Sequence, residues 1–115
     1  MTVIYQRGVG PVLTFDYGVI TDFSTNKKYQ LNWGTVSELG GKSLFKTTEY
    51  YVTQIGGPRL FRYYGSTFFK VRGHALAEVS DGIITDLTSD RQFEITGHLS
   101  RVEFLTALAI LFMGK

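Results

Sequence analysis

The last part of the chain is apolar on every side. Residues 102–113 read VEFLTALAILFM. A helix that is apolar around its whole circumference has no face for water, so it must be enclosed by protein or by lipid. Ser100 and Glu103 form the signature of a capping box at the start, and Gly114 fits the position just after the end. We therefore predict a helix over 100–113.

This helix is too short to cross a membrane. At about 1.5 Å per residue it extends roughly 20 Å, whereas a bilayer span needs roughly 20 consecutive apolar residues. We therefore expect no transmembrane span, and we expect the rest of the chain to build a structure that encloses the helix.

Short strands account for the remainder of the pattern. Thirteen glycines, two prolines and many aromatic and β-branched residues indicate strands joined by glycine turns. The glycine pairs at 40–41 and 56–57 mark loops or sharp corners. The expected strands are 2–7, 12–16, 18–24, 28–33, 44–54, 59–64, 67–72, 75–79, 82–88 and 92–96.

These elements predict a mainly β (β-rich α+β) fold. We expect an antiparallel sheet or small barrel of roughly 8–10 short strands packed around the C-terminal helix. A chain of 115 residues that is 43% hydrophobic can bury one core. The sequence therefore predicts a single domain over 1–115.

An internal repeat supports the hairpins. Residues 17–34 align without gaps on 81–98, an offset of 64, and both copies read strand, polar turn, strand. Asp22 and Asp86 occupy equivalent places, where we expect strand-face or turn residues. The match favours a duplicated hairpin, although two unrelated amphipathic hairpins can also resemble each other.

Charge is spread unevenly along the chain. Residues 42–72 carry six basic side chains against Glu49, a net charge of +5, whereas residues 73–115 carry a net charge of −3. This asymmetry predicts a dipolar surface, and two solvated faces of opposite sign would give the same pattern. The basic residues are Lys42, Lys46, Arg59, Arg62, Lys70 and Arg72.

Gly65 and Ser66 predict a two-residue type II′ turn between the strands at 59–64 and 67–72. The resulting register gives one core-like face with Leu60, Arg62, Tyr64, Thr67, Phe69 and Val71. The other face carries aromatic rings near the turn and basic residues at the base, and we expect it to be a ligand surface. With Arg62 added for its charge, the candidate ligand-binding residues are Arg59, Phe61, Arg62, Tyr63, Phe68, Lys70 and Arg72.

An aromatic and basic surface is typical of several kinds of binding. It can hold an anionic lipid head group, or it can stack the bases and track the phosphates of single-stranded nucleic acid. A barrel hairpin with ordinary solvated arginines has the same composition. We expect a non-enzymatic binding module for an anionic lipid or another anionic ligand. The alternatives are a protein-binding inhibitor or immunity-type protein and a single-stranded nucleic-acid binder.

The sequence offers little for catalysis, metals or export. His74 and His98 each follow a glycine at a strand end, and their spacing matches no zinc pattern. The chain has no cysteine, and residues 1–7 do not read as a secretory signal. We expect no enzyme activity, no catalytic or metal-binding residue and no cofactor. We expect a cytoplasmic location, with association at a membrane surface left open.

Two segments carry a resemblance to a known family. Residues 69–96, FKVRGHALAEVSDGIITDLTSDRQFEIT, and residues 103–111, EFLTALAIL, are similar to the strands and closing helix of the tubby C-terminal-like superfamily, which includes LURP-one-related proteins and phospholipid scramblases. The chain departs from that family in its shorter length and in the turns at 24–26 and 88–90, which lack the family's aspartate-to-glycine step.

The resemblance implies a closed antiparallel barrel around a central helix. It also implies a non-enzymatic module, with phosphoinositide binding in some members. No lipid-contact motif of the family transfers to this chain. Arg59, Arg62, Lys70 and Arg72 are therefore nominated by charge and register alone.

Overall fold

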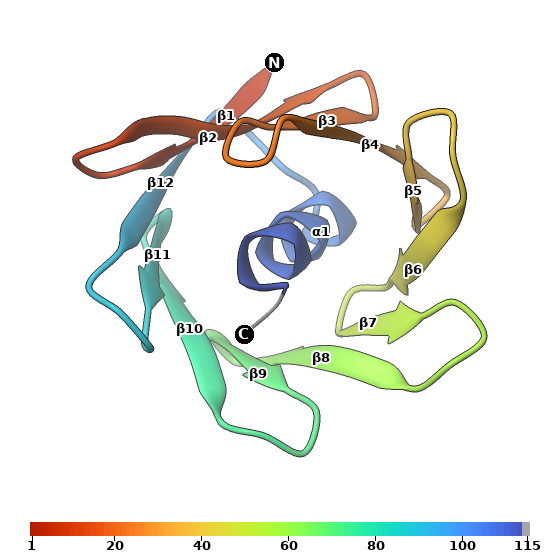
Figure 1. Ribbon diagram of the computed structural model, residues 1–115. Helices are drawn as coiled ribbons and strands as arrows, with labels where there is room; N and C mark the ends of the chain where they lie inside the picture. Colours follow the sequence, from red (N-terminus) through yellow and green to blue (C-terminus); the bar gives the residue numbers. More distant parts are fainter. Residues whose placement is uncertain (114–115) are drawn as a thin grey trace.

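The computed structural model describes residues 1–113 and shows twelve antiparallel strands closed into a barrel around one helix, α1 (Figure 1). Each strand pairs with its neighbours in sequence, and β1 pairs with β12 to close the ring. The elements are β1 (Thr2–Gln6), β2 (Gly10–Asp16), β3 (Val19–Asp22), β4 (Lys27–Asn32), β5 (Thr35–Glu38), β6 (Ser43–Thr47), β7 (Tyr51–Gln54), β8 (Arg59–Tyr64), β9 (Thr67–Lys70), β10 (Ala75–Ser80), β11 (Ile83–Asp86), β12 (Gln92–Thr96) and α1 (Arg101–Phe112).

The expected mainly β fold around a C-terminal helix is confirmed, but the strand number was too low. The single strand expected over 44–54 is two strands, β6 and β7, separated by a turn at 48–50. Thr48 makes this turn without glycine, because its hydroxyl accepts hydrogen bonds from the amides of Tyr50 and Tyr51. The strand β5 was missed because its four residues contain one buried apolar side chain, Val36.

The helix begins and ends close to the expected positions. Ser100 is the N-cap, and its hydroxyl and the Glu103 carboxylate complete the expected capping box. Met113 is the C-cap. The expected role of Gly114 lies outside the described residues. Within the part that the structure describes, no helix has the length and apolar character needed to cross a bilayer.

The barrel consists of six consecutive units of 16 residues that cover 1–96, each contributing two strands. The offset of 64 seen in the sequence is therefore four units. A ring of six fully buried side chains shows the period directly. These are Ile4, Ile20, Val36, Val52, Phe68 and Ile84.

Turns alternate between the two ends of the barrel. We call the end formed by the turns 17–18, 33–34, 48–50, 65–66 and 81–82 the entry rim, because α1 enters the barrel there after β12. We call the opposite end the exit rim. At the exit rim the amides of residues 23, 39, 55, 71 and 87 donate to the carbonyls of residues 12, 28, 44, 60 and 76, and the amide of Arg7 donates to Gln92 to close the circle.

The hairpins of 17–34 and 81–98 have the same register, which confirms the predicted equivalence. Tyr29 pairs with Ile20, and Phe93 pairs with Ile84, both at the offset of 64. The two aspartates act as turn residues: Asp22 accepts hydrogen bonds from Ser24, and Asp86 accepts them from Thr88.

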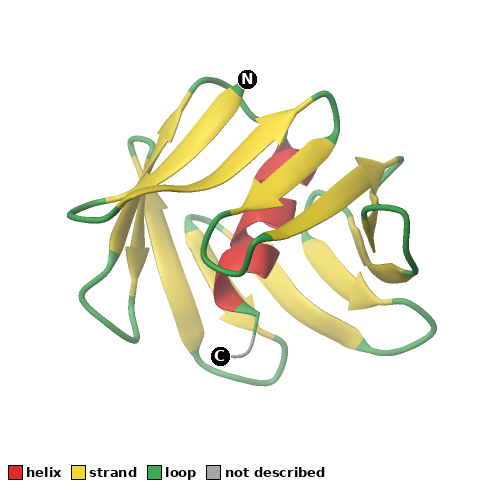
Figure 2. Ribbon diagram, turned by 45° about the horizontal axis from the view of Figure 1, so that its top comes forward, coloured by secondary structure: helices red, strands yellow, loops and turns green. Residues whose placement is uncertain are grey.

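The core lies between the inner face of the barrel and the helix, which runs through the centre (Figure 2). Phe112 contacts the rings of Phe68 and Phe93 at centroid distances of 6.2 and 6.4 Å. One buried polar contact joins the layers, because the Thr106 hydroxyl donates to the Thr47 hydroxyl at 3.1 Å. Burial on all sides explains why the helix needs no polar face.

Candidate functional site

The predicted hairpin exists with the predicted register. Gly65 and Ser66 connect β8 and β9, and Tyr64 pairs with Thr67. Gly65 has a φ of 62°, which fits the first position of a type II′ turn.

The two faces of this hairpin, however, are reversed relative to the expectation. Phe61, Tyr63 and Phe68 lie on the inner face of the barrel and are at most 8% exposed. Phe61 and Phe68 stack on each other with ring centroids 4.9 Å apart. Phe61 and Phe68 therefore belong to the core and cannot form the expected ligand surface. The reason is tertiary: the ring-rich face is the one that covers α1.

A β-bulge explains why Arg59 nevertheless faces outward. Between Val52 and Thr53 of β7 the pairing with β8 shifts, so that Val52 pairs with Phe61 and Thr53 pairs with Arg59, and Leu60 is passed over. A bulge adds one residue and reverses the alternation of faces beyond it. Arg59 consequently leaves the face of Phe61 and joins the outer face.

We define the arginine wall as the outer surface of β7–β9 and the turn after it, comprising Tyr51, Arg59, Arg62, Phe69 and Arg72. The guanidinium carbon of Arg59 lies 3.8 Å from the centre of the Tyr51 ring, and that of Arg62 lies 4.5 Å from the centre of the Phe69 ring. Stacking on a ring holds an arginine without using its hydrogen-bond donors at the rim of the guanidinium.

None of the arginines of the wall forms an ion pair with a carboxylate of residues 1–113. The two ion pairs found within residues 1–113, Arg7 with Glu94 and Arg91 with Asp86, both lie elsewhere on the barrel. The arginines of the wall therefore present positive charge to solvent.

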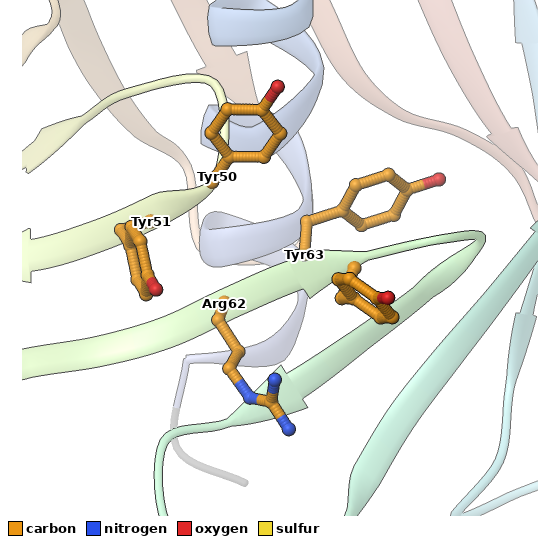
Figure 3. Close-up of a pocket in the computed structure, with 5 residues that line it drawn as sticks. Tyr50, Tyr51, Arg62 and Tyr63 are labelled. Carbon is orange, nitrogen blue, oxygen red and sulfur yellow. The ribbon is translucent and has the colours of Figure 1, made fainter.

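Two open depressions border the wall. The first, the tyrosine cleft, has a volume of about 250 Å³ and is lined by Tyr50, Tyr51, Arg62, Tyr63 and Tyr64 (Figure 3). Figure 3 shows Tyr51 and Arg62 on one side of the strands and Tyr50 and Tyr63 on the side of the helix. The cleft therefore lies at the edge of the wall, beside the entry rim.

The Tyr63 phenol stays neutral at physiological pH. Burial raises its pKa, and the nearby Arg101 guanidinium opposes that rise. Arg101 lies over the Tyr63 ring at 4.8 Å, and Phe104 meets the same ring edge-on. The helix therefore fixes the inner side of the cleft.

The second depression, of about 430 Å³, brings Arg59 and Arg72 together with Pro58 and Val71. Arg72 has a φ of 62° in the turn after β9, a conformation that few non-glycine residues adopt. The pair of guanidiniums on one open surface is the arrangement that binds phosphate or carboxylate groups.

Lys70 stands apart from this wall. It lies at the exit rim, half-buried, at the repeat position that Asp22 and Asp86 occupy in other units. Of the seven expected residues, the structure thus brings Arg59, Arg62 and Arg72 to one outer surface, with Tyr63 at its edge.

Sequence reasoning missed the aromatic part of the wall. Tyr51 was hidden within the single strand expected over 44–54, and Phe69 was assigned to the core face. The 16-residue period carries the missing signal, because it equates Phe68 with the buried Ile4 and Ile20 and so places Phe69 outside.

Neither histidine joins a metal site. His74 and His98 are exposed, and no group of three His, Cys, Asp or Glu side chains that could hold a metal ion is present among residues 1–113.

Comparisons with protein-family models, curated proteins and solved structures give no match for this chain. The barrel around a helix is the architecture that the resemblance to tubby C-terminal-like proteins implied, but a shared architecture assigns neither a family nor a function. The functional argument therefore rests on the site itself.

Proposed function

We propose that the protein is a cytoplasmic, non-enzymatic module that binds a phosphate-bearing ligand on the arginine wall. The observation that carries this proposal is the placement of Arg59, Arg62 and Arg72 on one outer surface with no carboxylate partner among residues 1–113. Arginines that share a surface without a carboxylate repel one another, and a bound anion reduces that repulsion.

The geometry of the wall supports phosphate as the recognised group. Arg59 and Arg62 rest on the rings of Tyr51 and Phe69, so both guanidinium groups are held in place before a ligand arrives. A planar guanidinium binds a phosphate through two parallel hydrogen bonds, and preordering reduces the entropy lost on binding.

The residues that line the two depressions support binding without turnover. They are tyrosine, arginine, proline and valine, and they include no histidine, carboxylate, serine or cysteine. General acid–base chemistry most often uses histidine, and nucleophilic chemistry most often uses serine or cysteine, whereas a tyrosine such as Tyr63, whose pKa is raised by burial, is a poor base at neutral pH.

Phosphate groups reach such a wall from a lipid headgroup or from a nucleic acid. The test is co-sedimentation with phosphatidylserine vesicles and titration with single-stranded DNA, each at two salt concentrations. The triple variant Arg59→Ala, Arg62→Ala and Arg72→Ala should bind its ligand with an affinity about 100-fold lower than wild type. This estimate takes about 1 kcal/mol per basic residue near an anionic surface.

A control variant with the same change in net charge distinguishes binding at the arginine wall from general electrostatic attraction. Lys27, Lys28 and Lys42 are exposed on another side of the barrel. Their triple alanine variant should bind within about twofold of wild type, because charge is lost away from the wall. Equal losses in both variants would show unspecific attraction, and a wild type that ignores both ligands would favour a protein partner on another surface.

A further inference from the structure

Four large aromatic side chains project from the entry rim into solvent. The exposed fractions are 101% for Tyr17, 93% for Trp33, 58% for Tyr50 and 76% for Tyr64. They belong to four different hairpins, and each lies in or directly beside a turn of the entry rim. We call these four residues the rim aromatics.

Two of the rim aromatics occupy backbone positions that disfavour them. Tyr17 and Trp33 are the first residues of two-residue turns, with φ values of 50° and 53°. Type I′ turns favour Asn, Asp or Gly there, because a bulky side chain at positive φ is strained. The equivalent residue of the sixth unit, Asp81, has a φ of 52° and follows the usual preference.

Burial of the Tyr17 and Trp33 rings contributes almost nothing to the stability of the fold. At exposures near 100%, Tyr17 and Trp33 bury no apolar surface, while their backbone conformation costs stability. Large side chains that are both strained and fully solvated are best explained by contact with something outside the chain.

We propose that the rim aromatics dock the barrel end-on into the interfacial layer of a lipid bilayer. Tyrosine and tryptophan prefer this layer, because their rings are apolar and their OH or NH groups still reach water. A protein partner is usually held by anchors clustered at the centre of one patch, whereas these rings stand on separate hairpin tips around the end of the helix. Separate tips suit a flat and fluid surface that each ring enters independently.

The attraction should not depend on charge. The turns of the entry rim contain no lysine or arginine, and they carry Glu49 and Asp81. Arg101, beside them at the start of α1, lies over the Tyr63 ring. This docking is therefore independent of the proposed anion binding. With the entry rim in the bilayer, the arginine wall would extend along the side of the barrel away from the membrane, and Arg62 would be its arginine nearest to the lipid.

The chain contains one tryptophan, Trp33, which makes the test direct. Neutral phosphatidylcholine vesicles should shift the Trp33 fluorescence to shorter wavelength, and brominated acyl chains should quench it, at both low and high salt. Tyr50→Ser with Tyr64→Ser should weaken this binding by about tenfold. An unchanged Trp33 spectrum with neutral vesicles would overturn the proposal, even if anionic vesicles bind through the arginine wall.

A second variant separates docking from folding. Tyr17→Asn with Trp33→Asn should lose co-sedimentation with neutral vesicles, yet its melting temperature should rise by about 4 °C because both turns receive a preferred residue. The control, Phe23→Asn with Leu39→Asn, removes two half-exposed apolar side chains at the exit rim and should bind like wild type. Loss of binding in the control alone would overturn the proposal, as would a concentration-dependent dimer that Tyr17→Asn with Trp33→Asn abolishes.

Discussion

Single residues at equivalent positions of the repeat make different contacts. Asp22 accepts hydrogen bonds from Ser24 and Thr25, and Asp86 accepts the same pair of contacts from Thr88 and Ser89. Asp86 gains two further bonds from the Arg91 guanidinium, at 3.0 and 2.7 Å, where the other copy has Lys27.

These contacts determine how Asp86 responds to pH. Burial alone would raise its pKa, but the hydrogen bonds from Thr88, Arg91 and Ser89 outweigh burial and hold the pKa well below its usual range. Ionised Asp86 therefore stabilises the fold at pH values above its unfolded pKa of about 4, and this contribution is lost as the pH falls through the folded pKa.

Asp86→Asn should lower the free energy of unfolding by about 2 kcal/mol at pH 7, because the guanidinium loses its charged partner. The variant should also lose stability less steeply than wild type below about pH 4. Urea unfolding across pH measures both effects. Asp22→Asn is the matched control without the arginine, and an equal loss in the two variants would show that Arg91 contributes nothing.

At the scale of elements, α1 and the hairpin turns depend on the barrel in different ways. Leu108 is fully buried in the middle of the helix and faces the inner wall of the barrel. Gly34, at the entry rim, approaches the neighbouring hairpin so closely that an added Cβ would lie 2.8 Å from the Thr47 carbonyl oxygen.

Leu108→Asp should prevent folding, since an unpaired carboxylate in the core is costly, and Leu108→Ala should lower stability by about 3 kcal/mol. Circular dichroism and urea unfolding measure these outcomes. Met113→Asp, at the 40% exposed end of the helix, should remain folded. A folded Leu108→Asp protein with an unchanged melting temperature would contradict the buried helix.

Gly34→Ala and Gly82→Ala form a matched pair at equivalent turns. Both glycines have positive φ, 81° and 77°, but an added Cβ at Gly82 meets open space. Gly82→Ala should cost about 1 kcal/mol from the backbone alone. Gly34→Ala should cost about 2 kcal/mol or more, because the Thr47 backbone must also shift. Equal losses in thermal unfolding would show that the close approach is unimportant.

For the whole molecule, the six-unit repeat explains how a chain of 115 residues encloses a helix on all sides. Each unit places the same positions inward, so the barrel offers α1 a largely apolar lining. Differences between units occur at outward positions, in turns and at a few inner positions, such as Thr47 and Lys70. The arginine wall arises from units four and five, and the rim aromatics come from units two to four.

The two proposed surfaces lie on different parts of the barrel, one on its side and one at its end. They therefore predict different binding behaviour: the wall requires anionic ligand and weakens with salt, whereas the rim tolerates neutral lipid and high salt. The single tryptophan reports the rim alone, so the two proposals can fail separately.

The sequence by itself determined the features that depend on neighbouring residues. The helix followed from its continuous apolar stretch and its capping box, and the register of β8 with β9 followed from Gly65 and Ser66. Period-two and turn signals act over a few neighbouring residues, so they can be read without knowing the fold.

Only the tertiary structure decided which face of each strand points inward, where bulges reverse the alternation, and that β1 pairs with β12. Both faces of the hairpin at 59–72 carry aromatic residues, so its sequence pattern does not distinguish inside from outside. Proximity to α1 and closure of the ring make that choice. The same closure moved Phe61 and Phe68 into the core and left Arg59, Arg62 and Arg72 on the surface, because burial beside the helix favours rings and excludes unpaired charge.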